Sequence, residues 1–203
     1  MNKVALLIRD YENKNLRSSK LFNFIKMITN ILKNQNIVLE LYIHTWKYNN
    51  EENWRKFSRK EITETYINNY FIDFNVKKII IEENENTNNN FVSWYGQYNL
   101  IKQIDSNYLF LINTSFDLNE NLNDVIIQVL NLIKQETVKK IYFTKSKCYE
   151  GINNCYYGDY NSMYYLINNF YNNYNKILDK YKETAYELIL WKESKKIDSY
   201  EIC

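Results

Sequence analysis

Short continuous apolar runs alternate along this chain with longer segments in which apolar residues recur every three or four positions. The continuous runs predict strands buried on both faces of a sheet, and the helical spacing predicts amphipathic helices. The predicted strands cover residues 4–8, 37–43, 76–81, 108–112 and 140–144. The predicted helices cover residues 21–32, 60–71, 92–104, 125–133, 162–178 and 181–191. This alternation predicts an α/β fold, a three-layer sandwich with a mainly parallel sheet.

No feature of the sequence divides the chain. There is no internal repeat and no linker rich in Pro, Gly or Ser, so residues 1–203 are expected to form a single domain. Residues 82–90 are a polar low-complexity run, which predicts a loop. Pro is absent and Gly occurs only 3 times, so we expect Asn and Asp to take the left-handed turn positions.

The charge balance and the residue types argue against several classes of function. With 26 basic and 24 acidic residues the net charge is +2, which gives no reason to expect nucleic-acid binding. The basic cluster of Arg55, Lys56, Arg59 and Lys60 is expected on the surface of a helix. With 3 Gly residues the chain has no glycine-rich phosphate loop, and its single His, His44, disfavours a Ser or Cys catalytic triad.

The cysteines and the apolar runs predict the compartment. Cys148, Cys155 and Cys203 match no zinc or redox spacing and are expected to be free thiols in a reducing compartment. No apolar run approaches the length of a transmembrane helix, and residues 4–8 are too short for a signal peptide. A cytoplasmic protein is therefore expected. The Tyr-rich run at residues 163–174 either packs on the sheet or exposes aromatic surface for an oligomer.

Polar residues gather where the predicted strands end. In an open α/β sheet, ligands bind outside the carboxyl ends of the strands. This rule selects Arg9 and Asp10 after the first strand, residues 44–46 after the second, Asp117 after the fourth and residues 151–159 after the fifth. We expect these residues to face one cleft. Carboxylates there suit a divalent cation that bridges two phosphates, because hard cations prefer oxygen ligands.

Several sequence segments, taken in order, match a known family. In chain order they are VALLIRDY, YIHTW, VKKIIIE, WYGQYNLIKQI, YLFLINTSFDL, KIYF, GINNCYYGD and YELILW, which together span nearly the whole chain. The sequence thereby resembles a family of glycosyltransferases found in giant viruses and some bacteria. The resemblance implies a nucleotide-diphosphate-sugar transferase (GT-A)-like fold, a nucleotide-sugar donor, and Mg²⁺ or Mn²⁺ with an acidic residue after the fourth strand. A viral member of the family would act in the host cytoplasm.

The resemblance also implies roles for individual residues. Asp117 corresponds to the acidic strand-end residue that contacts metal or sugar nucleotide, and Arg9 would meet the donor phosphates or base. Asp10 and Asn154 would belong to the same donor site. Asp159 would act as a general base on an acceptor hydroxyl. Other roles stay open: Arg9 as a strand-end surface residue, Asp117 as a turn or cap residue, and Asp159 as the N-cap of the next helix.

Trp94, Tyr95 and Gly96 form an aromatic stretch. Two interpretations, a ligand-binding role and a structural role, are open for it as well. The resemblance implies that an aromatic ring stacks on a base or sugar while Gly96 permits a close approach. The alternative is that these rings pack in the core from one face of a helix. For His44 and Trp46 we expect structural roles, with the His satisfied by backbone and the Trp closing the end of the sheet.

At four positions the sequence departs from the family pattern. Ser115 stands where relatives carry a basic residue, Asn153 where they carry Asp, Tyr186 where they often carry His, and Asp10 where they tend to have Gly. A lost cation and a lost carboxylate weaken the neutralisation of leaving-group charge. Two hypotheses follow. The first is a protein that transfers a sugar from a nucleotide-sugar donor to a glycan or protein acceptor, and the alternative is a catalytically degenerate member that acts as a binding or scaffold subunit.

Overall fold

The computed structural model describes residues 2–9, 19–53, 56–83, 89–116, 122–134, 141–145, 152–182, 186–194, 196 and 200–202, and the structural statements below concern these residues. The elements, in chain order, are β1 (Asn2–Arg9), α1 (Ser19–Lys33), β2 (Ile37–Trp46), β3 (Tyr48–Asn53), β4 (Lys56–Glu61), α2 (Glu64–Tyr70), β5 (Val76–Glu82), α3 (Asn89–Ile101), β6 (Phe110–Ser115), α4 (Leu122–Ile133), β7 (Ile141–Lys145), β8 (Ile152–Gly158), α5 (Tyr160–Lys180), α6 (Tyr186–Ser194) and β9 (Tyr200–Ile202).

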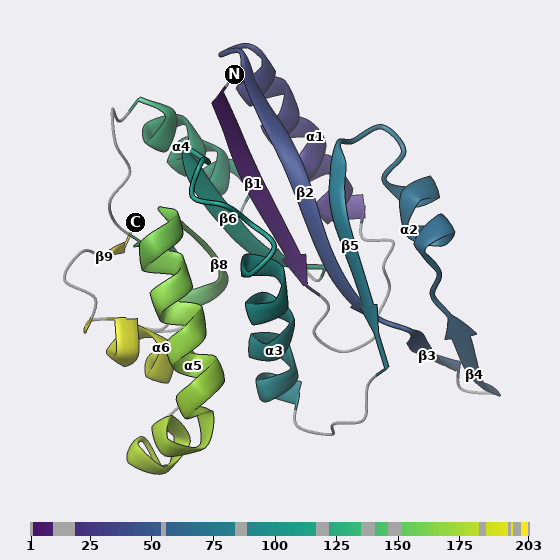
Figure 1. The fold of residues 1–203 in the computed structure, drawn as a ribbon, viewed down its shortest axis with the longest axis vertical. Helices are drawn as coiled ribbons and strands as arrows, with labels where there is room; N and C mark the ends of the chain where they lie inside the picture. The colour runs from purple at the N-terminus through teal and green to yellow at the C-terminus, as the bar shows by residue number, and fades with distance from the viewer. Residues whose placement is uncertain are drawn as a thin grey trace.

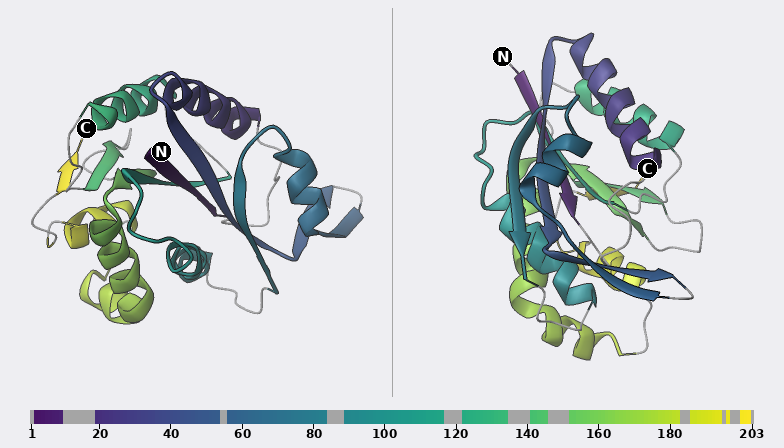
Figure 2. Two further views of the ribbon diagram at one scale, coloured as in Figure 1. Left: turned by 45° about the horizontal axis from the view of Figure 1, so that its top comes forward. Right: turned by 90° about the vertical axis from the view of Figure 1, so that its right-hand side faces the viewer.

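Within the described residues, seven strands form one mixed sheet in the order β5-β2-β1-β6-β8-β7-β9, and β3 and β4 form a separate hairpin. Helices cover both faces of the sheet. The helices α1 and α4 lie on one face, and α3 and α5 lie on the other (Figure 1, Figure 2). Strands β5, β2, β1 and β6 run parallel. The expected three-layer α/β sandwich with a mainly parallel sheet is confirmed.

The four parallel strands end at the same edge of the sheet, which we call the carboxyl edge. Strand β1 pairs in register with β2 up to Arg9 opposite His44, and with β6 up to Arg9 opposite Ser115. On the outer side of β2, the pairing with β5 ends at Trp46 opposite Glu82. The opposite edge, where these strands begin, is the amino edge.

The pleat of β1 divides the core into two layers. Val4, Leu6 and Ile8 pack in the layer of α1 and α4, whereas Ala5 and Leu7 pack in the layer of α3 and α5. All five side chains are fully buried. Burying an aliphatic side chain of the size of Leu or Ile stabilises a fold by about 1.5–3 kcal/mol. A continuous apolar run is therefore the sequence of a strand that is covered on both faces.

Asn36 takes a left-handed backbone conformation between α1 and β2. Its φ is 56°. The amide groups of Gln35 and Asn36 donate to the carbonyls of Leu32 and Lys33 at 2.9 and 3.0 Å, which satisfies two carbonyls at the end of the helix. The expected use of Asn where other chains place Gly is confirmed at this turn.

The region of the basic cluster is a hairpin, and the helix expected there was wrong. Strands β3 and β4 pair antiparallel from Tyr48 opposite Glu61 to Asn53 opposite Lys56. The helix that follows, α2, begins only after Thr63, whose hydroxyl accepts a hydrogen bond from the amide of Tyr66 at 3.2 Å. Lys56, Arg59 and Lys60 therefore lie on β4, and Arg55 lies outside the described residues. The helical spacing was extended too far toward the N-terminus because the cap at Thr63 was overlooked.

Strand β8 was not expected, and its direction corrects the predicted place of Asp159. It pairs antiparallel with β6, with Leu111 opposite Gly158 and Asn113 opposite Tyr156. Asp159 therefore follows β8 at the amino edge. The four residue steps of β6 from Leu111 to Ser115 span about 13 Å along the sheet. The expectation that Asp159 shares one cleft with Arg9 was wrong, because the strand before Asp159 runs in the opposite direction.

At the amino edge, Asp159 is the N-cap of α5. Its Oδ1 accepts a hydrogen bond from the amide of Ser162 at 3.1 Å, and its own backbone is extended. This is the alternative role that the sequence left open for this residue. Most of the Tyr-rich run at residues 163–174 packs inward from α5, with Met163 and Phe170 fully buried, while Tyr165 is 56% exposed.

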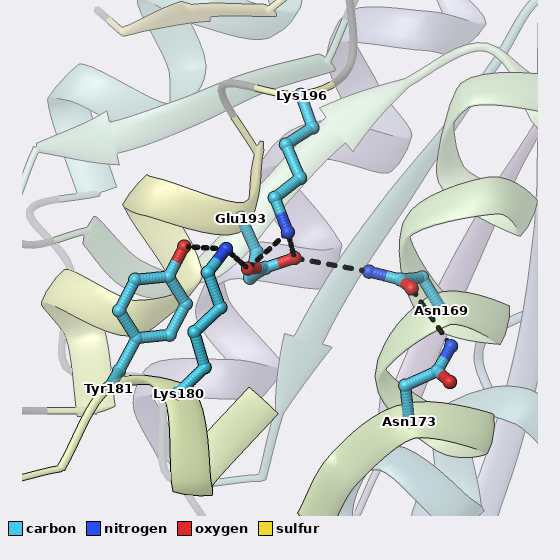
Figure 3. A network of polar contacts seen from close by, with 6 residues as sticks. All are labelled: Asn169, Asn173, Lys180, Tyr181, Glu193 and Lys196. Carbon is cyan, nitrogen blue, oxygen red and sulfur yellow. Dashed lines mark hydrogen bonds and ion pairs between the residues drawn. The ribbon is translucent and has the colours of Figure 1, made fainter. Parts of the chain in front are cut away.

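A buried carboxylate fixes α6 against α5. Glu193 is 1% exposed, and its oxygens meet Lys196 and, at 3.4 Å, the ammonium of Lys180 (Figure 3). The amide of Asn169 on α5 donates to the same carboxylate at 3.4 Å. Burial alone raises the pKa of Glu193, but the bonds and charges of Lys196 and Lys180 outweigh it and hold the pKa below its ordinary value. The carboxylate therefore stays ionised at neutral pH and pairs with both lysines.

Two structural facts bear on the predicted compartment. Among the described residues, no helix combines the length and the apolar character needed to cross a bilayer. Cys155 is fully buried, forms no disulfide within the described residues, and donates from its thiol to the Tyr157 hydroxyl at 3.3 Å. Cys148 and Cys203 lie outside the described residues.

The capping role of Asp159 gives the first prediction. Asp159→Ala should lower the free energy of unfolding by about 1 kcal/mol, because the amide of Ser162 loses its acceptor. Asp159→Asn keeps a side-chain oxygen at the cap and should cost much less. Urea unfolding of both variants measures the difference, and an equal cost for Asn and Ala would show that the cap contributes nothing.

Candidate functional site

The order of the strands marks one point on the carboxyl edge. From β1 the chain goes to β2 and β5 on one side, and it then crosses to β6 on the other side of β1 (Figure 1). In open α/β sheets, ligands bind outside the carboxyl ends of the strands where the order reverses in this way. That point lies between β1 and β6, where Arg9 is opposite Ser115 and the Phe116 amide donates to the Arg9 carbonyl at 3.1 Å.

A row of polar side chains ends the parallel strands at this point. His44, Arg9 and Ser115 stand opposite one another on β2, β1 and β6. Their exposed fractions are 0%, 1% and 5%. Residues paired in register on parallel strands point to the same face, here the face of α3 and α5. The apolar strand sequences therefore give way to a buried polar row directly beneath the carboxyl edge.

Arg9 lies beside a layer of uncharged polar groups between the sheet and α3. The positive charge of Arg9 acts on Tyr156, whose pKa is nevertheless raised because the hydroxyl is buried. The Tyr156 hydroxyl donates to Oε1 of Gln97, and Nε2 of Gln97 donates to the Ser93 carbonyl at 3.2 Å. Tyr156 and Gln97 are fully buried, and Ser93 is 2% exposed. A cation thus sits close to the switch point with little water around it, where its attraction for an anion is weakly screened.

A second polar cluster joins β2, β5 and α3 at the same edge. Nε2 of His44 lies 2.7 Å from Oε2 of Glu82. The Tyr95 hydroxyl donates to Oε1 of Glu82 at 3.2 Å, and the Asn99 amide donates to the two carboxylate oxygens at 3.3 and 3.1 Å. The hydrogen bond from His44 is the largest cause of the lowered pKa of Glu82, and burial opposes it. Glu82 is therefore an ionised, 28% exposed carboxylate held by three side chains.

Gly96 makes room for this cluster. A Cβ atom at Gly96 would lie 2.7 Å from Nδ1 of His44, closer than real Cβ contacts allow. The His44 ring also meets the Trp46 ring edge-on, with 4.8 Å between the ring centroids. Trp46 in turn stacks on Tyr95, with 6.2 Å between their centroids. The close approach expected at Gly96 is therefore made by His44 of this chain. His44 itself pairs with a carboxylate, where a backbone partner had been expected.

Trp94 lies in the core, so its expected role in stacking on a base or sugar was wrong. It is 1% exposed and stacks on Phe170 of α5 at 4.2 Å with an interplanar angle of 12°. The alternative interpretation, an aromatic face packed inward from a helix, applies to this residue. Tyr95, one position further on, is only partly buried and directs its hydroxyl to Glu82.

Four predicted residues of the site cannot be placed together with Arg9. Asp10 and Asp117 lie outside the described residues. Asn154 lies on β8, but its side chain is outside the description, and Asp159 lies at the amino edge. The Mg²⁺ or Mn²⁺ ion stays a prediction. Among the described residues, no group of three or more His, Cys, Asp or Glu side chains is placed to hold a metal.

Sequence reasoning missed Glu82 and Asn99. Glu82 was assigned to a polar loop because it begins the run of residues 82–90, yet it is the last residue of β5. A strand-end carboxylate on the third predicted strand was the available signal, since the same rule had selected Arg9 and Asp117. No pattern in the sequence pointed to Asn99, which lies in the middle of a helix.

Comparison with known proteins identifies the fold. No family model and no curated protein matches this sequence. A 4-diphosphocytidyl-2C-methyl-D-erythritol synthase of Anaerococcus prevotii DSM 20548 has a similar structure, with a TM-score of 0.53 and 10% identity over 100% of this chain and 88% of that chain. The chain therefore has a GT-A-like fold, as expected, and this similarity shows the fold alone.

Two other solved structures are similar at lower scores. Mouse xyloside xylosyltransferase 1 has a TM-score of 0.45 and 8% identity, over 99% of this chain and 85% of that one. The glycosyltransferase GlyE of Streptococcus pneumoniae TIGR4 has a TM-score of 0.47 and 10% identity, over 100% of this chain and 46% of that one.

The packing of His44 on Gly96 gives a prediction about stability. Gly96→Ala should lower the free energy of unfolding by about 1–3 kcal/mol, because the added methyl group must displace the His44 ring. In a His44→Ala background the same change should be neutral or stabilising by up to about 1 kcal/mol, since Ala is the better helix residue. A double-mutant cycle by urea unfolding measures this coupling. Equal costs in the two backgrounds would contradict the predicted clash.

The lowered pKa of Glu82 gives a prediction about pH. The folded protein favours the ionised carboxylate, so its stabilising contribution is present above the ordinary value of 4.5 and is lost as the pH falls below it. The loss of stability caused by Glu82→Gln should therefore be fully present above about pH 4.5 and should shrink as the pH falls below that value. Urea unfolding at several pH values tests this, with Glu64→Gln, an exposed change on α2, as the control. A Glu82→Gln effect that is independent of pH would contradict the pairing with His44.

Proposed function

We propose that this protein binds a nucleotide-sugar donor at the carboxyl edge and transfers the sugar to a glycan or protein acceptor. The observation that carries the proposal is the buried cation Arg9. It stands opposite Ser115 in the strand register, at the point where the strand order reverses. The rule for open α/β sheets independently selects this point for a ligand. The GT-A-like fold agrees with it.

Arg9 would act on the donor mainly through its charge. Because its side chain is 1% exposed, it is nearly covered by its own protein. A positive charge in a poorly solvated position attracts the negative phosphates of a donor over several ångströms. Ser115, which is 5% exposed beside it, offers a hydroxyl and no charge.

Asp117 and Asp10 would lie near the donor phosphates and complete the donor site. Asp10 follows β1 directly, and Asp117 follows Phe116 after the end of β6. In the proposal, Asp117 would hold Mg²⁺ or Mn²⁺, and the ion would supply positive charge that offsets the negative charge of the donor phosphates. Glu82, the partly exposed carboxylate at the same edge, is suited to accept hydrogen bonds from sugar or ribose hydroxyls. Asp159 has no part in the proposal, because it lies at the amino edge.

A binding subunit without turnover is the second candidate. The specific observation in its favour is the pair at the switch point, where Ser115 carries no charge and Arg9 is almost fully covered. Transfer from a nucleotide diphosphate needs a cation or metal at the developing leaving-group charge. A protein that binds the donor but releases no nucleotide in the presence of acceptor would be such a subunit.

Donor binding can be tested by thermal unfolding. Purified protein is titrated with UDP-, GDP-, CMP- and dTDP-sugars, each with and without Mn²⁺. A donor at about 100 times its dissociation constant should stabilise the native state by about 2.7 kcal/mol and raise the melting temperature by several degrees. The increase should depend on Mn²⁺, because the metal screens the diphosphate charge.

Two variants connect this effect with the carboxyl edge. Asp117→Ala should abolish the increase in melting temperature, whereas Asp159→Asn, at the other edge of the sheet, should keep it. No increase with any of the four nucleotides would refute donor binding. An increase that Asp159→Asn removes and Asp117→Ala keeps would place the donor at the amino edge instead.

A further inference from the structure

A pocket lies beside β2 at the amino edge, far from the proposed donor site. Its volume is about 470 Å³. Ile37, Leu39 and Leu41 of β2 form its apolar floor, Phe74 contributes a wall, and Lys33 and Asp73 lie on its rim. This volume is within the usual range of pockets that hold a ligand group.

The edge of β2 is open along this pocket. The pairing with β5 begins at Leu41 opposite Val76, so the ladder does not reach the first four residues of β2 (Figure 1). The amide of Leu41 donates to the Asn75 carbonyl at 2.9 Å, on the outer side of the strand. Because backbone groups of alternate residues point to the same side of a strand, the N–H and C=O of Leu39 also point outward. Such an edge can pair with another chain.

An exposed apolar residue is next in sequence to a residue that lines this pocket. Ile72 is 75% exposed, the highest value among the large apolar side chains described, and it immediately precedes Asp73 on the rim. The rim also carries both signs of charge, with Lys33 at the end of α1 and Asp73 in the segment between α2 and β5. One patch therefore presents a projecting apolar side chain, an apolar hollow, a cation and an anion.

We propose that this patch is a two-fold symmetric interface between two copies of this chain. In such an interface the same surface of both copies must be complementary to itself. Ile72 of one copy enters the pocket of the other, and Lys33 of one copy faces Asp73 of the partner subunit. The open edge of β2 supplies backbone hydrogen-bonding groups for the contact. The interface lies at the opposite end of the sheet from Arg9, so both donor sites stay accessible in the dimer.

Sedimentation velocity of the full chain over a range of concentrations tests the proposal. The wild-type protein should show a reversible monomer–dimer equilibrium. Ile72→Glu should weaken dimerisation by about tenfold or more, because a charge would enter an apolar pocket. Ile127→Glu is the matched control. Ile127 is 57% exposed on α4, outside the patch, and the same substitution there should leave the equilibrium unchanged.

A charge exchange adds a test of the arrangement. Lys33→Glu alone should weaken the dimer, and Lys33→Glu combined with Asp73→Lys should restore it. Unfolding curves confirm that each variant is folded, which is expected because the three side chains are exposed. A wild-type protein that stays monomeric at about 100 µM, where interfaces of ordinary size are populated, would overturn the proposal. A dimer that resists Ile72→Glu, or one that Ile127→Glu weakens equally, would overturn it too.

Discussion

In-register parallel pairing of β1 with β2 and β6 determines where polar chemistry can gather in this protein. The pairing brings His44, Arg9 and Ser115 to the same level of the sheet, directly beneath the carboxyl edge. A shift of one residue in either pairing would turn His44 or Ser115 to the other face of the sheet, away from the side chain of Arg9. The buried cation, the switch point between β1 and β6, and the cluster around Glu82 all depend on this register.

The same constraint explains which parts of the fold could be predicted from the sequence. Strands covered on both faces must be largely apolar, so β1, β2 and β6 were each found close to their observed positions. The edge strand β5, which has no fully buried residue, and β7 were found from their short apolar runs. Strand β8 was missed because its sequence, INNCYYG, has two Asn residues after Ile152 and no continuous apolar run, so it resembles a loop. Its direction in the sheet depends on pairing with β6, which is more than 40 residues earlier in the sequence (Leu111 opposite Gly158), and that direction placed Asp159 at the amino edge.

The sequence predicted only those parts of the candidate site that can be recognised from a single residue and its neighbours in the chain. Arg9 ends an apolar run, so the strand-end rule found it from local sequence. The cluster around Glu82 requires His44 and Gly96, which are separated from Glu82 by 38 and 14 residues and meet it only after β2, β5 and α3 have packed. For Trp94, helical spacing fits a core residue and a ligand-stacking residue equally well, and only the contact with Phe170 decides between them.

The central claim is that the ligand site lies over the ends of β1 and β6. Hydrogen–deuterium exchange measured by mass spectrometry tests it most directly, with each nucleotide sugar of the donor panel added in turn together with Mn²⁺. The account predicts slower exchange in peptides that contain Arg9 and Phe116, and no change in the peptide that contains Asp159 and the start of α5. Slower exchange at Asp159 without any effect at Arg9 and Phe116, or no effect with any donor, would contradict it.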